Sequence, residues 1–212
     1  MKKGYVVGLA TGLMLLGCVA GANADPFQGQ LWEGTSAATT AADNATPTNF
    51  SVLGTPTATF TVNSINAYFN SSATYETFLG GPSNVTWLTG GSIQNSTIVS
   101  STSTGTAFEF TGTAYFAADT GITHDDGFSI ILLDPTTHHV DLTILNGSET
   151  TAETTYLGNT AGVYSFELFY GAANGFPEVI QAPITPTPEP ATMVLFGFGL
   201  AGFAGLRLRK KA

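Results

Sequence analysis

The chain has 212 residues, a formal net charge of −9, and all six of its lysines and arginines at its two ends. Residues 25–206 hold all fifteen acidic residues and no lysine or arginine, so a domain formed there has no fixed cation for a phosphate backbone or an anionic lipid, which excludes both as partners. The single cysteine, Cys18, excludes an internal disulfide.

The amino terminus has the layout of a secretory signal peptide. Lys2 and Lys3 precede an apolar segment at 5–16, and Ala22-Asn23-Ala24 supplies the small residues of a cleavage site. We expect residues 1–24 to be removed after passage through the Sec translocon. The alternative uses Leu15-Leu16-Gly17-Cys18, which approximates a lipoprotein box with Cys18 as the lipidated residue.

Residues 25–48 are rich in Ala, Thr and Asn, with Trp32 as a large apolar anchor. Neither a strong strand pattern nor a helical repeat is visible here. We expect an extended lead-in or a loosely packed first strand, followed by a long loop.

From residue 57 onward, short runs of β-branched and aromatic residues are separated by Gly, Pro, Asn and Ser. Residues 75–79 could form one helical turn, and no helical repeat is found outside the two terminal apolar stretches. This pattern predicts an all-β ectodomain at 25–181, folded as a two-sheet sandwich. The expected strands are 57–62, 65–69, 85–88, 93–101, 106–117, 128–133, 140–145 and 163–170.

Three segments of this domain carry a family resemblance. The strand at 108–116 is followed by a tight acidic turn, His124-Asp125-Asp126-Gly127, and then by a strand ending at Asp134; residues 161–170 later give the pattern "aGvYsfelfY". Over about residues 106–182 the chain resembles the β-sandwich shared by protective-antigen-type toxins, fibro-slime proteins and yeast flocculin adhesins. The resemblance implies a non-enzymatic carbohydrate-binding domain.

Asp125 and Asp126 are the main candidate metal ligands. Adjacent carboxylates repel each other unless a cation or several backbone N–H groups compensate, and Ca²⁺ accepts such oxygen ligands. The flocculin resemblance implies that the pair holds Ca²⁺, which in turn contacts sugar hydroxyls, with Asn174 as a further contributor. The alternative is a solvated turn in which the aspartates cap local backbone amides.

The other polar residues give weaker predictions. His138 and His139 are neighbours, which would point to opposite faces of a strand, so we expect a solvated loop and not a metal site. His124 beside Asp125 could suggest an acid–base pair, but no G-x-S-x-G nucleophile motif accompanies it. Six glutamates of the domain are too scattered for spacing to pair any two. We therefore expect no enzymatic activity and no catalytic residues.

The carboxyl-terminal segment has three parts. Residues 182–190 form a proline-spaced linker, expected to be extended. An uncharged apolar run follows at 191–206, which as a helix would be roughly 24 Å long, short for a transmembrane span. Residues 207–212 contribute Arg207, Arg209, Lys210 and Lys211, whose positive charge predicts a cytoplasmic end.

Pro188-Glu189-Pro190, the apolar run and the basic end together resemble the PEP-CTERM tail of bacterial surface proteins. The resemblance implies recognition by exosortase, a sorting peptidase of the membrane, with the three motif residues serving for recognition. We expect the short helix to hold the chain in the inner membrane until processing near this motif. The alternative is an ordinary single-span anchor.

These features predict an exported protein of the cell surface or extracellular matrix. Its expected role is that of a non-enzymatic adhesin or an exopolysaccharide-associated binding or structural protein, with calcium as the expected cofactor if the aspartate pair binds metal. A secreted polysaccharide hydrolase is the alternative from another functional class.

Overall fold

The computed structural model describes residues 24–69, 74–79, 81–88, 98, 105–146, 151–173, 175–176 and 178–187. The chain divides into two units. One comprises Pro26–Thr187 and contains the folded domain. The other comprises Met1–Asp25 and Pro188–Ala212, and all of it except residues 24 and 25 lies outside the described residues.

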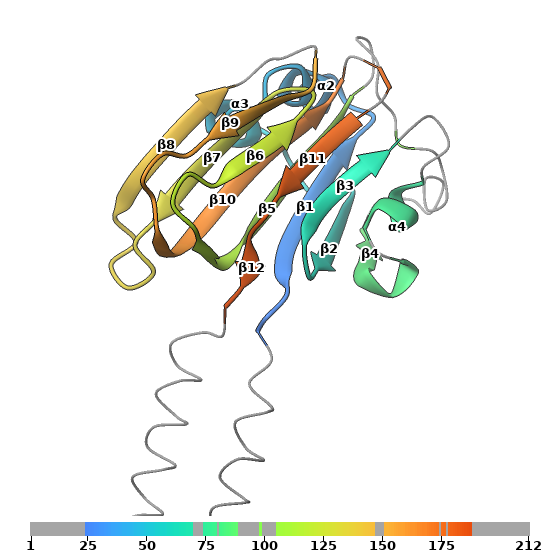
Figure 1. The fold of residues 1–212 in the computed structure, drawn as a ribbon. Helices are drawn as coiled ribbons and strands as arrows, with labels where there is room; N and C mark the ends of the chain where they lie inside the picture. Colours follow the sequence, from blue (N-terminus) through green and yellow to red (C-terminus); the bar gives the residue numbers. More distant parts are fainter. Residues whose placement is uncertain are drawn as a thin grey trace, which may run out of the picture. The chain divides into compact units, whose positions relative to one another are not determined.

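Two antiparallel sheets form the domain (Figure 1). In the described residues, the larger sheet, sheet A, has the strand order β4-β2-β1-β5-β10-β7-β8, with β12 also paired to β5; the smaller, sheet B, has the order β3-β11-β6-β9. The strands of sheet A are β1 (Phe27–Glu33), β2 (Ala58–Val62), β4 (Val85–Trp87), β5 (Thr106–Phe116), β7 (Phe128–Leu133), β8 (Val140–Asn146), β10 (Gly162–Ala172) and β12 (Thr185–Pro186). Those of sheet B are β3 (Ile65–Phe69), β6 (Gly121–His124), β9 (Glu153–Tyr156) and β11 (Glu178–Ala182).

The core lies between the sheets. Alternate residues of β5 and β10 point inward, including Phe108, Phe110, Phe166 and Leu168, all at most 1% exposed. Sheet B contributes inward residues such as Ile180. The prediction of an all-β sandwich is confirmed, because the period-two pattern of these strands places one set of side chains in a shared apolar layer.

Two short helices, α2 (Ser36–Asp43) and α3 (Pro47–Phe50), follow β1. Thr35 caps α2 by accepting a hydrogen bond from the Ala38 N–H, and alanine has the highest helix propensity of any residue. Ala38, Ala41 and Ala42 share the buried side of α2. The expected first strand is present as β1, which pairs with β2 from Phe27 to Leu31 and with β5 from Gln28 to Glu33. The long loop expected after it is wrong, because the capped, alanine-rich α2 and then α3 follow.

Most of the other predicted elements are present in the structure. The strands expected at 57–62, 65–69, 85–88, 106–117, 128–133, 140–145 and 163–170 are present, and the helical turn is α4 (Tyr75–Phe78), followed by a 3-10 turn at Pro82–Asn84. Strands β6, β9 and β11 were not predicted. Except for the buried Ile98, the strand expected at 93–101 lies outside the described residues.

The segment expected to be an extended linker begins inside the domain. Ala182 ends β11, Ile184 is 3% exposed, and Thr185 and Pro186 pair with Tyr115 and Ala114 of β5. Residues 182–187 therefore differ from the expectation of a free linker. The pairing of β1 with β5 ends at Thr111, and β12 pairs with the part of β5 that β1 does not reach.

Candidate functional site

The aspartate pair lies where the chain crosses from one sheet to the other. His124 ends β6 in sheet B, and Phe128 begins β7 in sheet A. The Asp125 N–H donates to the carbonyl of Val179 in sheet B at 3.0 Å, and the Gly171 N–H of sheet A donates to the carbonyl of Gly127 at 3.0 Å. This segment is thus an inter-sheet connection held by both sheets, and not a tight turn.

The two carboxylates differ in their surroundings. Asp126 is 1% exposed, and its Oδ2 accepts a hydrogen bond from the Ala173 N–H at the end of β10 at 2.5 Å. Asp125 is 9% exposed, and its carboxylate makes no hydrogen bond to the described residues. Burial, followed by the neighbouring Asp126 carboxylate, raises the pKa of Asp125, while His124 opposes the shift.

His124 holds this connection in place. Its ring is buried against Phe128, with ring centroids 4.5 Å apart. Nδ1 lies 2.9 Å from the backbone carbonyl oxygen of Asp126, and Nε2 lies 3.0 Å from Thr155 Oγ1 and 3.6 Å from Glu153 Oε1. Because a carbonyl oxygen only accepts, Nδ1 must carry the proton and donate it to Asp126. Nδ1 therefore holds the backbone of the connection, and Nε2 ties the ring to side chains of β9.

Sequence reasoning missed two members of the site, Tyr170 and Glu178. The Tyr170 hydroxyl donates to Glu178 Oε2 at 3.0 Å, and both side chains are fully buried. Burial and the Glu178 carboxylate, with smaller contributions from Asp126 and Asp125, raise the pKa of Tyr170 well above its usual value. The alternation of β10 would have placed Tyr170 inside; Glu178 shares the inward side with Ile180, but its strand was not predicted.

Asp43, the last residue of α2, interacts electrostatically with Asp126. Burial, and then the Asp126 carboxylate, raises the pKa of Asp43. We call Asp43, Asp125, Asp126, Tyr170 and Glu178 together the acidic end. Since residues 25–206 contain no lysine or arginine, no fixed cation of the domain compensates these carboxylates.

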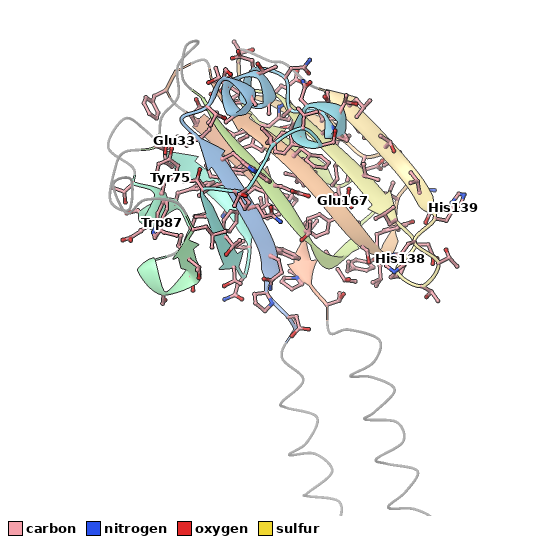
Figure 2. The ribbon with its side chains drawn as sticks, turned by 180° about the vertical axis from the view of Figure 1, so that it is seen from behind. Glu33, Tyr75, Trp87, His138, His139 and Glu167 are labelled. Atoms are coloured by element: carbon pink, nitrogen blue, oxygen red, sulfur yellow. The ribbon has the colours of Figure 1, made fainter. Side chains whose placement is uncertain are left out.

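A second polar side chain, the half-buried Glu33, lies at the same level of sheet A, because Glu33 pairs with Thr106 and Thr106 pairs with Ala172. Figure 2 shows Glu33, Tyr75 and Trp87 close together. The Tyr75 hydroxyl lies 2.7 Å from Thr106 Oγ1, and its ring meets Trp87 edge-on at 6.0 Å. Burial raises the pKa of Glu33, opposed by its hydrogen bond with Tyr75.

His138 and His139 lie far from these groups, in the β7–β8 turn (Figure 2). Asp134 organises this turn, because its Oδ1 accepts from the N–H groups of Thr136 and Thr137. Both histidines are exposed, and His139 Nδ1 is 3.8 Å from Asp141 Oδ1. The prediction of a solvated loop is confirmed for these residues.

The metal-binding capacity of the site is limited to what the carboxylates supply. In the described residues, no group of three or more His, Cys, Asp or Glu side chains could hold a metal ion by itself. Asn174, expected to contribute, lies outside that part of the chain. Any ion at Asp125 and Asp126 would complete its shell with carbonyl, water or ligand oxygens, as Ca²⁺ commonly does.

The carboxyl-terminal tail matches a known sorting motif. Residues 186–210 match the PEP-CTERM protein-sorting motif, which confirms the prediction from sequence and indicates an exported protein sorted to the cell surface or extracellular space. Pro188, Glu189 and Pro190 fall inside the match, as do Arg207, Arg209 and Lys210, while Lys211 follows it. All seven lie outside the described residues.

Among the helices in the described part of the chain, none has the length and apolar character of a transmembrane span. The helix expected at 191–206 lies outside that part.

Several solved structures resemble the chain. Among them are the PA14 domain of the MpAFP antifreeze protein (16% identity, 78% of this chain and 84% of that one, TM-score 0.44), the PA14 sugar-binding domain of an RTX adhesin (15%, 77% and 91%, 0.46), and the A domain of epithelial adhesin 6 from Candida glabrata in complex with Galβ1-3GlcNAc (10%, 79% and 82%, 0.40). No similar sequence was found among curated proteins. Likeness at this level does not establish a shared ligand or site.

Proposed function

We propose that this protein is a non-enzymatic component of the cell surface or extracellular matrix whose β-sandwich binds carbohydrate within exopolysaccharide. Its PEP-CTERM tail supports delivery to that compartment. The cation-free composition of residues 25–206 supports a hydrated, non-nucleic-acid environment. The expected sorting partner is an exosortase-type peptidase, and the tail is held in the inner membrane before processing near Pro188-Glu189-Pro190.

The finer part of the proposal is a Ca²⁺ ion at Asp125 and Asp126 that contacts sugar hydroxyls. The observation that carries it is the Asp125 carboxylate, which is buried beside Asp126 without a hydrogen-bond partner among the described residues. A buried carboxylate in this situation either takes a proton or binds a cation. Since the domain contains no lysine or arginine, a divalent cation from outside is the natural complement.

The test is calcium titration calorimetry on the full chain purified in detergent, followed by glycan-array binding with and without EGTA. Asp125→Asn keeps the shape of the side chain and breaks no hydrogen bond seen among the described residues, so it should remove calcium binding and leave the fold intact. Asp141→Asn, at an exposed position of β8, is the matched control. Absence of calcium binding in the wild type contradicts the metal site, and turnover of any glycan contradicts a non-enzymatic role.

A further inference from the structure

The outer side of sheet A carries a polar surface that the helices do not cover. On each of three adjacent strands, an apolar outward residue lies two positions from a polar one. The pairs are Trp32 and Gln30 on β1, Ala107 and Glu109 on β5, and Phe169 and Glu167 on β10. The first of each pair packs under α2 and α3. Figure 2 shows the two helices over one part of this side and Glu167 on the part that they leave open.

A groove of about 160 Å³ runs across this open part. Its lining consists of Gln28, Gly29, Gln30, Thr59, Glu109 and Thr111. The register explains the grouping, because Gln30 lies opposite both Thr59 and Glu109, and Gln28 lies opposite Thr111.

The groove's side chains have unused hydrogen-bonding capacity. Gln30, Thr59, Glu109 and Thr111 make no side-chain hydrogen bond to the described residues. An amide supplies both donors and acceptors, a hydroxyl supplies either, and a carboxylate accepts from hydroxyl groups. This is the combination that neighbouring sugar hydroxyls require.

The surface continues along β5 to an exposed aromatic ring. Thr113 and Tyr115 follow Thr111 on the same side of the strand, and Tyr115 is 50% exposed between Val163 of β10 and Thr185 of β12. From Glu109 to Tyr115 the strand extends about 20 Å, enough for several sugar rings in a row. A tyrosine ring offers the apolar face on which the C–H side of a sugar packs.

The charge of this surface selects among polysaccharides. Glu109 and Glu167 interact electrostatically on neighbouring strands, and residues 25–206 contain no lysine or arginine to offset them. An acidic polysaccharide would therefore be repelled. We propose that this open face, defined by Gln28, Gln30, Thr59, Glu109, Thr111, Thr113, Tyr115 and Glu167, binds a non-acidic polysaccharide chain along β5 without calcium.

This inference rests on the proposed binding of polysaccharide and gives it a second site, away from the acidic end. The test is calorimetry on the full chain in detergent with EDTA, using cellohexaose, xylohexaose, maltohexaose and mannohexaose as neutral probes and hexagalacturonate as the acidic probe. At least one neutral probe should bind. Tyr115→Ala should weaken it by about tenfold, because an exposed aromatic contact is typical of an affinity-determining residue.

Matched controls come from sheet B, where Tyr156 is 66% exposed and Gln181 is also exposed. Tyr156→Ala and Gln181→Ala should leave affinity unchanged, whereas Gln30→Ala should weaken it. The double variant Glu109→Gln with Glu167→Gln should gain binding to hexagalacturonate. The inference is overturned if no neutral probe binds, if EDTA abolishes the binding, or if Tyr115→Ala and Tyr156→Ala behave alike. If the wild type binds a neutral probe but no calcium, the metal site at Asp125 and Asp126 is contradicted and this inference stands.

Discussion

The covered and open halves of sheet A's outer side belong to the same strands, yet they are built differently. In the covered half, Trp32, Phe50 and Phe169 form an edge-to-face aromatic chain, with centroid distances of 5.8 and 4.9 Å. The Trp32 indole N–H donates to the Gly54 carbonyl at 2.9 Å. In the open half, Gln30, Glu109 and Glu167 occupy the next outward positions, with no helix or strand of the described residues over them.

The difference shows that α2 and α3, and not the strands, determine how far the apolar cluster of Trp32, Phe50 and Phe169 extends along the sheet. Burial of aromatic surface stabilises the covered half, and each large side chain contributes roughly 1.5–3 kcal/mol relative to exposure. The open half gives up that contribution and keeps hydrogen-bonding groups at the surface. Changes to the two halves should therefore affect different properties: stability in the covered half, and ligand binding or charge in the open half.

The largest expected effect is in the covered half. Phe169→Ala removes a ring that is 4% exposed and packed on Phe50, so the free energy of unfolding should fall by about 3–5 kcal/mol. Urea unfolding of the purified protein, followed by tryptophan fluorescence, measures this change. Glu167→Ala, on the same strand in the open half, is the control and should change stability by no more than about 0.5 kcal/mol. Equal losses would show that the two halves do not differ in this way.

How much of this fold the sequence predicts depends on the kind of pattern. Strands β2, β7 and β10 were predicted because β-branched and aromatic residues continue through them. The helix α2 was not, because its Ser-Ala-Thr composition resembles a polar loop, and its small alanines matter only once a sheet lies beneath them. Strand β9 has only one half-buried residue among exposed ones, so it gives little signal of burial.

The candidate site was predicted only where its members are adjacent in sequence. Asp125 and Asp126 are neighbours, so their pairing could be recognised. Glu178 and Tyr170 join them through the β10–β11 connection, which meets the β6–β7 connection only after both sheets form. Likewise, the opposition of Gln30 and Glu109 depends on the β1–β5 register, which no local spacing reveals.

A smaller loss is expected where α2 approaches β10. A Cβ added to Gly171 would overlap the backbone carbonyl group of Ala42, which cannot rotate away. Gly171→Ala should therefore push the helix outward and lower the free energy of unfolding by about 1–3 kcal/mol. Gly54→Ala, where an added Cβ meets nothing within 4 Å, is the matched control in urea unfolding. If Gly171→Ala left the free energy of unfolding unchanged, α2 would not be packed tightly against β10.

The smallest expected effect concerns charge in the open half. Burial, and then the Glu167 carboxylate, raises the pKa of Glu109, so the folded protein keeps this proton to a higher pH than the unfolded chain does. The resulting stabilisation is complete below the unfolded pKa of about 4.3 and is lost as the pH rises through the folded value. Glu109→Gln cannot ionise, so at pH 7 it should be more stable than the wild type by less than about 1 kcal/mol.

Urea unfolding at about pH 3.5 and pH 7 tests this pH dependence, since the gain should vanish at the lower pH, where the glutamate is protonated in both states. Asp119→Asn, which removes one exposed charge from a turn, controls for the change in net charge. In a Glu167→Gln background the gain from Glu109→Gln should shrink, because the second cause of the raised pKa has been removed. If Glu109→Gln stabilised the protein equally at both pH values, the gain would come from packing and not from charge. The open half would then resemble the covered half.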